Sequence, residues 1–134
     1  MYNKIMENKK LILLVDDNKD FLEILSTKLT LSGFKIETAL NGEEGLLKLK
    51  KIKPDLVVLD LEMPVLGGID AFSKIKEDAD LANLKVVFLT NYGEPREGEN
   101  WYDEKIAREV GAADFIKKSE DVDRIVDIIR SHVV

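Results

Sequence analysis

The sequence predicts an α/β fold of the (βα)5 type, in which a doubly wound parallel sheet of five strands carries helices on both faces. Two observations lead to this prediction. Short apolar runs recur along the chain, and stretches with helical spacing of apolar residues lie between them. Repeated strand–helix units with right-handed crossovers give a parallel sheet covered on both sides. The 134 residues leave room for one such domain.

Five apolar runs are the predicted strands. In chain order they are Leu11–Val15, Lys35–Ala39, Leu56–Asp60, Val86–Thr90 and Ala113–Lys117. The runs at 11–15 and 56–59 contain no polar residue, which is typical of strands that are buried on both faces of a parallel sheet.

The first and last helices are predicted from apolar residues that share one helical face. These residues are Leu22, Leu25 and Leu29 in the first helix, and Val122, Ile125, Ile129 and Val133 in the last. Asn41 before Gly42-Glu43-Glu44 resembles a capping box. We expect Asp20 to cap the first helix and Ser119 to cap the last. The stretch from Asn91 to Asn100 contains two glycines and a proline and predicts a long loop.

Composition excludes several classes of function. The net charge of −6 argues against direct nucleic-acid binding, which needs a basic surface. The absence of cysteine excludes disulfides, zinc thiolate sites and a cysteine nucleophile. His132 is the sole histidine, and we expect it at the surface or in the tail rather than in a catalytic triad. The longest apolar run is too short for a signal sequence or a membrane span, so we expect a cytoplasmic protein with no membrane contact.

Chemistry is expected where the parallel strands end, because ligands bind beyond the carboxyl ends of the strands in such sheets. The residues at these ends are Asp16, Asp17, Asp60, Thr90 and Lys118. Three converging carboxylates repel one another unless a hard cation lies among them, and Mg²⁺ with oxygen ligands is the usual choice. Three carboxylates and one ammonium sum to −2, which one Mg²⁺ would neutralise.

Asp60 has the position of a nucleophile, because it ends a rigid apolar strand and a turn follows at once. Attack by a carboxylate on a phosphoryl donor gives an aspartyl phosphate. The carboxylate is then replaced by a group of charge about −2, which leaves the site at about −1 with Mg²⁺ and at about −3 without it. Lys118 can supply an ammonium and Thr90 a hydroxyl donor.

These motifs resemble the receiver domains of two-component response regulators, over roughly residues 10–134. The matching elements are Asp16-Asp17, Asp60-Leu61-Glu62-Met63-Pro64 with Gly67-Gly68, Thr90, and the segment from Gly111 to Lys118. The resemblance implies the strand order 2-1-3-4-5 of the flavodoxin-like and CheY-like folds. Residues 1–9 are then a leader, and residues 10–134 the receiver domain.

The resemblance also implies a role for each matching residue. Asp60 is the phosphoacceptor; Asp17, Asp60 and the backbone carbonyl of Glu62 hold Mg²⁺, with Asp16 acting through a water. Lys118 pairs with the phosphoryl group, Thr90 is the switch hydroxyl, and Phe115 is the aromatic that moves inward with Thr90. Register from Gly111 favours Lys118 over Lys117, which we expect to face solvent.

The function implied is a phosphorylation switch rather than an enzyme with turnover on a small substrate. Asp60 would accept a phosphoryl group from a sensor histidine kinase or a histidine phosphotransfer protein and lose it by self-dephosphorylation. The signal would pass to an unknown partner through the fourth helix, fifth strand and fifth helix. No output domain is expected after the last helix, although a fragment of a longer parent would look the same. The alternatives are a pseudo-receiver that never takes phosphate, and a phosphohydrolase in which Glu62 serves as acid or base.

Plainer interpretations stay open for several residues. Asp16-Asp17 could be a solvated strand end or a helix cap, Thr90 a β-branched strand residue, and Phe115 a core aromatic. Trp101 and Tyr102 could form a partner surface or pack the long loop.

Three departures from the family pattern affect expectations. Asn91 is larger than the usual residue after Thr90, so we predict slow reaction with acetyl phosphate that Asn91→Ala relieves. Ser119 replaces the usual proline, so we expect a trans bond after Lys118. The segment from Thr90 to Gly111 is longer than usual, and in it we expect Tyr92 to shield the acyl phosphate.

Overall fold

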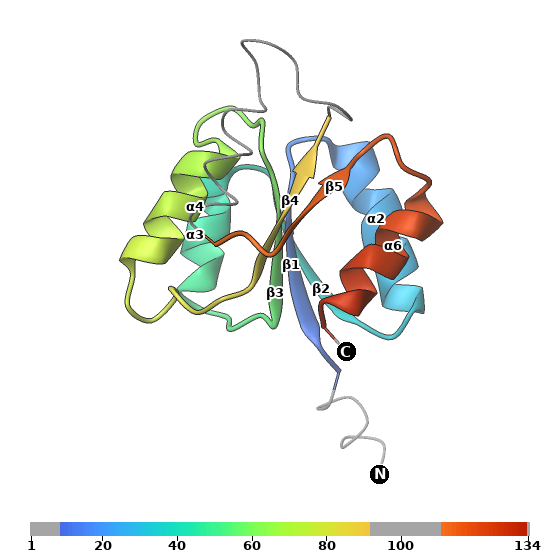
Figure 1. The fold of residues 1–134 in the computed structure, drawn as a ribbon, viewed down its shortest axis with the longest axis horizontal. Helices are drawn as coiled ribbons and strands as arrows, with labels where there is room; N and C mark the ends of the chain where they lie inside the picture. Colours follow the sequence, from blue (N-terminus) through green and yellow to red (C-terminus); the bar gives the residue numbers. More distant parts are fainter. Residues whose placement is uncertain (1–8, 92–110, 134) are drawn as a thin grey trace.

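The computed structural model describes residues 9–91 and 111–133 and has five strands and four helices in these ranges (Figure 1). The strands are β1 (Leu11–Val15), β2 (Lys35–Ala39), β3 (Leu56–Asp60), β4 (Val86–Thr90) and β5 (Asp114–Lys117). The helices are α2 (Lys19–Leu31), α3 (Gly42–Leu49), α4 (Gly68–Glu77) and α6 (Val122–Ser131). The predicted fourth helix and the residues Tyr92, Trp101 and Tyr102 lie outside the described ranges, as does most of the predicted leader.

The strands form one parallel sheet in the order β2-β1-β3-β4-β5, which confirms the predicted fold class and strand order. Four of the five strands have the bounds that the apolar runs predict. The fifth begins at Asp114, one residue later than predicted, although the backbone N–H of Ala113 already donates to the Val86 carbonyl at 2.8 Å. Because all strands run in one direction, their carboxyl ends meet at one edge of the sheet.

Helices cover both faces of the sheet: α2 and α6 lie on one side, and α3 and α4 on the other (Figure 1). The alternating side chains of β1 divide between two cores. Ile12 and Leu14 face the core beneath α2 and α6, whereas Leu13 and Val15 face the core beneath α3 and α4. Both faces of β1, β3 and β4 are therefore buried, which is why these segments read as nearly continuous apolar runs.

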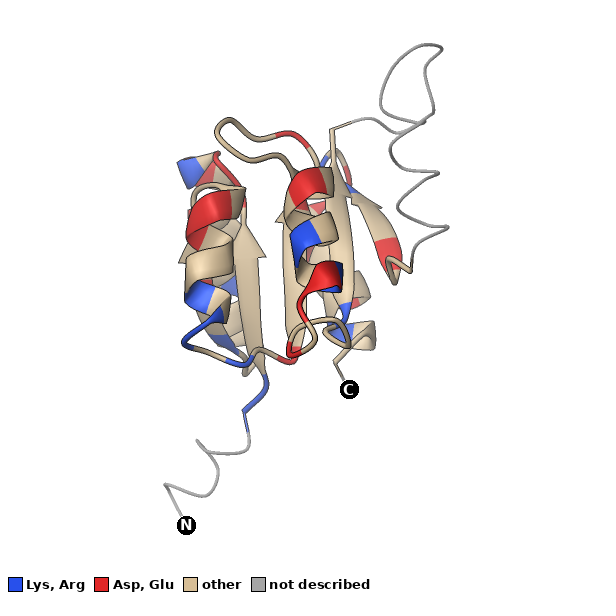
Figure 2. Cartoon of the chain, turned by 90° about the vertical axis from the view of Figure 1, so that its left-hand side faces the viewer, with Lys and Arg blue, Asp and Glu red and all other residues tan. Residues whose placement is uncertain are grey.

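Charged residues at the helix ends follow the helix dipole. In Figure 2, α3 carries acidic residues (Glu43 and Glu44) in its first turn and Lys48 in its last. Asn41 caps this helix as predicted, because its side chain accepts a hydrogen bond from the Glu44 N–H at 2.8 Å. The Glu44 carboxylate completes the box by accepting from the Leu40 N–H at 3.2 Å, one residue before the cap.

The caps predicted for the first and last helices are wrong. Asn18, not Asp20, caps α2 and accepts from the Phe21 N–H at 3.1 Å. Asp20 already lies in the first helical turn, where its charge favours the dipole but cannot cap. Asp121, not Ser119, caps α6 and accepts from the Asp123 N–H at 2.8 Å.

Ser119 cannot cap α6 because it belongs to the turn that precedes the helix. In this turn the Glu120 N–H donates to the Lys117 carbonyl at 3.1 Å. The described peptide bonds are all trans, which confirms the trans bond predicted between Lys118 and Ser119. Among the described residues, no helix combines the length and the apolar character that a membrane crossing requires.

Candidate functional site

Three carboxylates meet at the carboxyl edge of the sheet. Asp16 and Asp17 follow β1, and Asp60 ends the neighbouring strand β3, where the register pairs Val15 with Leu59. One oxygen from each of the three carboxylates lies within 4.8 Å of the other two. The predicted convergence of these acids at one edge is therefore what the fold produces.

Asp16 is fully buried at this edge. Its Oδ1 accepts a hydrogen bond from the Asn18 N–H at 2.9 Å, which ties the carboxylate to the turn before α2. Its Oδ2 lies 2.7 Å from the Nζ of Lys118. That contact is an ion pair without hydrogen-bond geometry, and no other group in the described ranges donates to Oδ2. A buried carboxylate oxygen thus remains open to a further electrostatic partner.

Asp60 is also buried, with 1% of its surface exposed. Its Oδ1 accepts from the Glu62 N–H at 3.3 Å, and its Oδ2 lies 3.8 Å from Lys118 Nζ. Burial, followed by repulsion from Asp16, raises the pKa of Asp60 from 3.8 to about 7, against the opposing effect of Lys118. In the absence of a metal ion, the site therefore resists full ionisation of its carboxylates.

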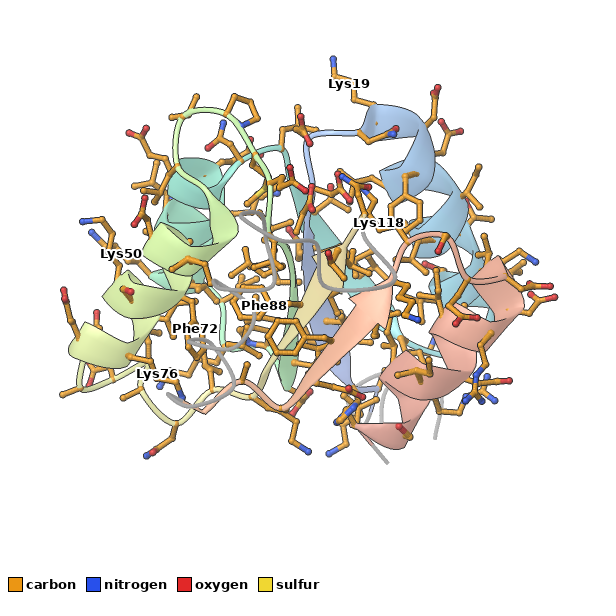
Figure 3. All side chains as sticks on the ribbon, turned by 45° about the horizontal axis from the view of Figure 1, so that its top comes forward. Lys19, Lys50, Phe72, Lys76, Phe88 and Lys118 are labelled. Atoms are coloured by element: carbon orange, nitrogen blue, oxygen red, sulfur yellow. The ribbon has the colours of Figure 1, made fainter. Side chains whose placement is uncertain are left out.

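Lys118, not Lys117, brings its ammonium to the carboxylates (Figure 3). Its side chain is only 12% exposed. The Lys118 N–H donates to the Thr90 carbonyl at 2.7 Å, so the backbone at this position is fixed to the end of β4. Lys117 is the last residue of β5 and lies in register with Thr90.

Thr90 and Glu62 lie at or just beyond the ends of β4 and β3, whereas Phe115 lies farther back in β5, against the core. Thr90 ends β4 and is buried, which places it on the strand next to Asp60. Glu62 is exposed two residues after Asp60. Phe115 stacks on Phe88 with ring centroids 5.3 Å apart and packs against the core beneath α3 and α4. Figure 3 shows Phe88 beside Phe72 in this core, and their rings meet edge to face.

The turn after Asp60 is held tightly. A Cβ at Gly68 would lie 2.4 Å from the Asp60 carbonyl oxygen, so a glycine is required where α4 begins. Val65 has a φ of 70°, and the Leu66 N–H donates back to the Pro64 carbonyl at 2.8 Å. The Gly42 N–H donates to the Leu66 carbonyl at 3.1 Å, which joins this turn to the start of α3.

The donor set fits a hard divalent cation. It consists of carboxylate oxygens, one of them buried without a hydrogen-bond donor among the described residues, and it carries more negative charge than one ammonium balances. Oxygen ligands of this kind are what Mg²⁺ prefers. Asp17, which is exposed, offers an oxygen from the solvent side.

Sequence reasoning missed two residues that shape the site. Asn18 holds the Asp16 carboxylate through its N–H and caps α2 through its side chain. Phe21 places its ring under the Lys118 ammonium, with 4.7 Å between Nζ and the ring centroid. An Asn directly after the acidic pair is a recognisable capping signal. The position of Phe21 depends on tertiary packing and has no local signal.

Comparisons with known proteins agree with this geometry. The family model for the response regulator receiver domain matches residues 12–130. The chain is 40% identical over 114 residues to the probable transcriptional regulator ycf27 of Pyropia yezoensis, covering 84% of this chain and 43% of that protein. It is 40% identical over 123 residues to the CpxR homolog of Haemophilus influenzae, covering 89% and 50%. The chain thus spans about half the length of the curated relatives it matches.

Solved structures of response regulators have a similar fold. The response regulator TrrA of Thermotoga maritima, solved in complex with Mg²⁺ and BeF, is 31% identical with a TM-score of 0.76, over 92% of this chain and 98% of that one. The chemotaxis protein CheY4 of Vibrio cholerae is 23% identical with a TM-score of 0.81, over 94% and 99%, and supports the fold alone. With a matching family model over most of its length, the chain belongs to the response regulator receiver domain family.

Proposed function

We propose that the chain is a phosphorylation switch that accepts a phosphoryl group on Asp60 in a Mg²⁺-dependent reaction. The observation that carries this proposal is the juxtaposition of a buried carboxylate, two further carboxylates and one ammonium at the edge of the sheet. With Mg²⁺ bound among the carboxylates, such a group would balance the charge of a transferring phosphoryl group with little movement of the protein. The expected donor is a phosphohistidine of a sensor kinase or of a phosphotransfer protein.

In the transfer step, one oxygen of Asp60 forms a bond to phosphorus while the bond from phosphorus to the donor breaks. The donor group leaves with the electron pair of that bond, as imidazole from phosphohistidine or as acetate from acetyl phosphate. In self-dephosphorylation, water attacks phosphorus and the Asp60 carboxylate leaves. One phosphoryl group is thus taken up and released, without turnover on a small substrate.

We expect the metal ion, the ammonium and the hydroxyl each to interact with different oxygens of the phosphoryl group. Mg²⁺, held by Asp17, Asp60 and the Glu62 carbonyl with Asp16 acting through a water, would supply positive charge beside the phosphoryl oxygens. Lys118 is placed to pair with a phosphoryl oxygen, because its Nζ is 3.8 Å from Asp60 Oδ2. Thr90 ends the adjacent strand, from which its hydroxyl would donate to another oxygen.

The conformational output is part of the same proposal. Movement of Thr90 toward the phosphoryl group would allow Phe115 to move inward and change the face formed by β5 and α6. Several curated relatives, which this chain matches over about half of their length, are named as transcriptional regulators. If the parent protein resembles them, DNA binding would belong to a further domain, in line with the net charge of −6 here. We place the domain in the cytoplasm with its kinase partner.

Intact mass after incubation with Mg²⁺ and acetyl phosphate tests the proposal. Wild type should gain one phosphoryl group, whereas Asp60→Asn should gain none. Omission of Mg²⁺ or the substitution Asp17→Asn should suppress the gain in mass. A folded wild-type protein that gains no phosphoryl group from acetyl phosphate or from any histidine kinase would instead identify a pseudo-receiver.

A further inference from the structure

The Lys118 ammonium lies between two kinds of partner. On one side are the carboxylates of Asp16 and Asp60, with oxygens 2.7 and 3.8 Å from Nζ. On the other side is the ring of Phe21, whose centroid is 4.7 Å from Nζ. This distance is within the range of a cation–π attraction, and the low exposure of Lys118 strengthens it because little water screens the charge.

Phe21 is held in place by the same turn that holds Asp16. The Asp16 carboxylate accepts from the Asn18 N–H at 2.9 Å, and the Asn18 side chain accepts from the Phe21 N–H at 3.1 Å. The ring also packs against the core beneath α2 and α6. The acid and the ring that contact the ammonium are therefore both fixed to the start of α2 through Asn18.

An aromatic ring suits this position for a chemical reason. A lysine side chain is flexible, and restricting a freely moving ammonium at each transfer would cost conformational entropy. A carboxylate partner restrains the ammonium but occupies its N–H donors. The face of a phenyl ring attracts the charge without accepting a conventional hydrogen bond, so the donors stay free for phosphoryl oxygens.

We propose that Phe21 is a positioning residue for Lys118, which holds the ammonium beside Asp60 while the ammonium leaves its ion pair with Asp16 and donates to the incoming phosphoryl group. This inference rests on the proposed function of Asp60. Phe21 would act through Lys118 and would touch neither donor nor metal ion. Its removal should slow the transfer step more than it weakens donor binding.

The test compares two variants of Phe21 with a matched core variant. Phe21→Leu removes the aromatic face and keeps an apolar side chain, whereas Phe21→Tyr keeps the ring. Phe34→Leu is the control, because Phe34 belongs to the same core cluster. The readouts are the rate of phosphorylation at several acetyl phosphate concentrations with Mg²⁺, and the ring-current shift of the Lys118 ε-methylene protons by NMR without phosphate.

The expected result for Phe21→Leu is loss of the upfield shift and a maximal rate lower by about five- to tenfold, the range that a buried cation–π contact of this strength implies. The half-saturating donor concentration should stay near that of wild type. Phe21→Tyr and Phe34→Leu should resemble wild type in both readouts.

An unchanged Lys118 shift in Phe21→Leu would overturn the inference, and so would an equal loss of rate in Phe34→Leu. A wild-type protein that takes no phosphoryl group would overturn the proposed function together with the kinetic role of Phe21. The NMR shift would still decide whether the ring holds the ammonium, so the two failures are distinguishable.

Discussion

Gly68 packs directly on the backbone of Asp60, and a Cβ at this glycine would lie 2.4 Å from the Asp60 carbonyl oxygen. The Cα of Leu61 is nearly as close, at 2.8 Å from the same position. The Gly68 N–H donates to the Leu61 carbonyl at 3.1 Å, so the first residue of α4 is joined to the residue after Asp60. The orientation of Asp60 therefore depends on the absence of a side chain eight residues later.

Gly68→Ala should displace the backbone at Asp60. We expect a loss of about 1–3 kcal/mol in the free energy of unfolding, because the contacts are with backbone atoms that cannot move aside. Phosphorylation by acetyl phosphate should slow as well. Gly67→Ala is the matched control, because its nearest neighbour would lie 3.7 Å away, and it should cost less than about 1 kcal/mol. Equal urea midpoints for the two variants would contradict this account.

The metal-free protein should lose stability as pH rises from about 4 to about 7. The pKa of Asp60 is raised to about 7 by burial and by Asp16, so the folded state binds a proton more tightly than the unfolded state does. The stabilisation is complete below the unfolded value of 3.8 and is lost as Asp60 ionises toward pH 7. The full shift corresponds to a loss of about 4 kcal/mol.

Urea unfolding in EDTA at pH 5 and pH 8 measures this effect. Asp60→Asn should unfold at similar urea concentrations at both pH values and should exceed wild type at pH 8. Asp127→Asn removes a charge from an exposed position on α6 and should keep the wild-type pH dependence. If Asp60→Asn retains the full dependence, the ionisation of Asp60 is not its cause.

Magnesium should stabilise wild type and not Asp17→Asn. An ion that binds only the folded state adds about 1.4 kcal/mol at a concentration about ten times its Kd. Asp17 is exposed, so its replacement removes a ligand at little cost to the fold. The shift in melting temperature with added MgCl2 measures this, and Asp20→Asn, on the first turn of α2, serves as the control. A similar shift in all three proteins would argue against the site.

His132 and Asp114 should contribute to the attachment of α6. His132 Nε2 lies 2.9 Å from Asp114 Oδ2, and its side chain is 18% exposed rather than lying free in a tail. Replacing His132 by alanine should lower the free energy of unfolding by about 0.5–1 kcal/mol, as for a partly exposed polar pair. A double-mutant cycle with Asp114→Asn measures the coupling. The exposed Lys28–Asp123 pair between α2 and α6 should couple more weakly, because water screens it.

Strand ends were the most predictable part of the site. Asp60 and Thr90 each close an apolar run, and a buried parallel strand leaves little choice about where the polar residues begin. The assignment of Lys118 over Lys117 required the register of β5, which the sequence supplied through the distance from Gly111. Placement of these residues follows from a rule of topology that holds for any parallel sheet.

Caps and tertiary contacts were less predictable. Two candidate caps lie two residues apart at the start of α2 and again before α6, and only the path of the preceding turn selects Asn18 and Asp121. The raised pKa of Asp60 depends on burial that no local pattern encodes. The contact between Phe21 on α2 and Lys118 after β5 joins residues that are far apart in the chain, so it depends on the complete tertiary fold.

The parallel sheet has a kinetic consequence. Asp60 ends β3, and Asp16 and Lys118 directly follow β1 and β5; none of these strands follows another directly in the chain. Their alignment requires pairing between strands that are distant in the chain, and such pairing loses loop entropy before contacts compensate for it. A nascent or partly unfolded chain thus lacks the cluster of carboxylates and ammonium that the proposed phosphoryl transfer requires.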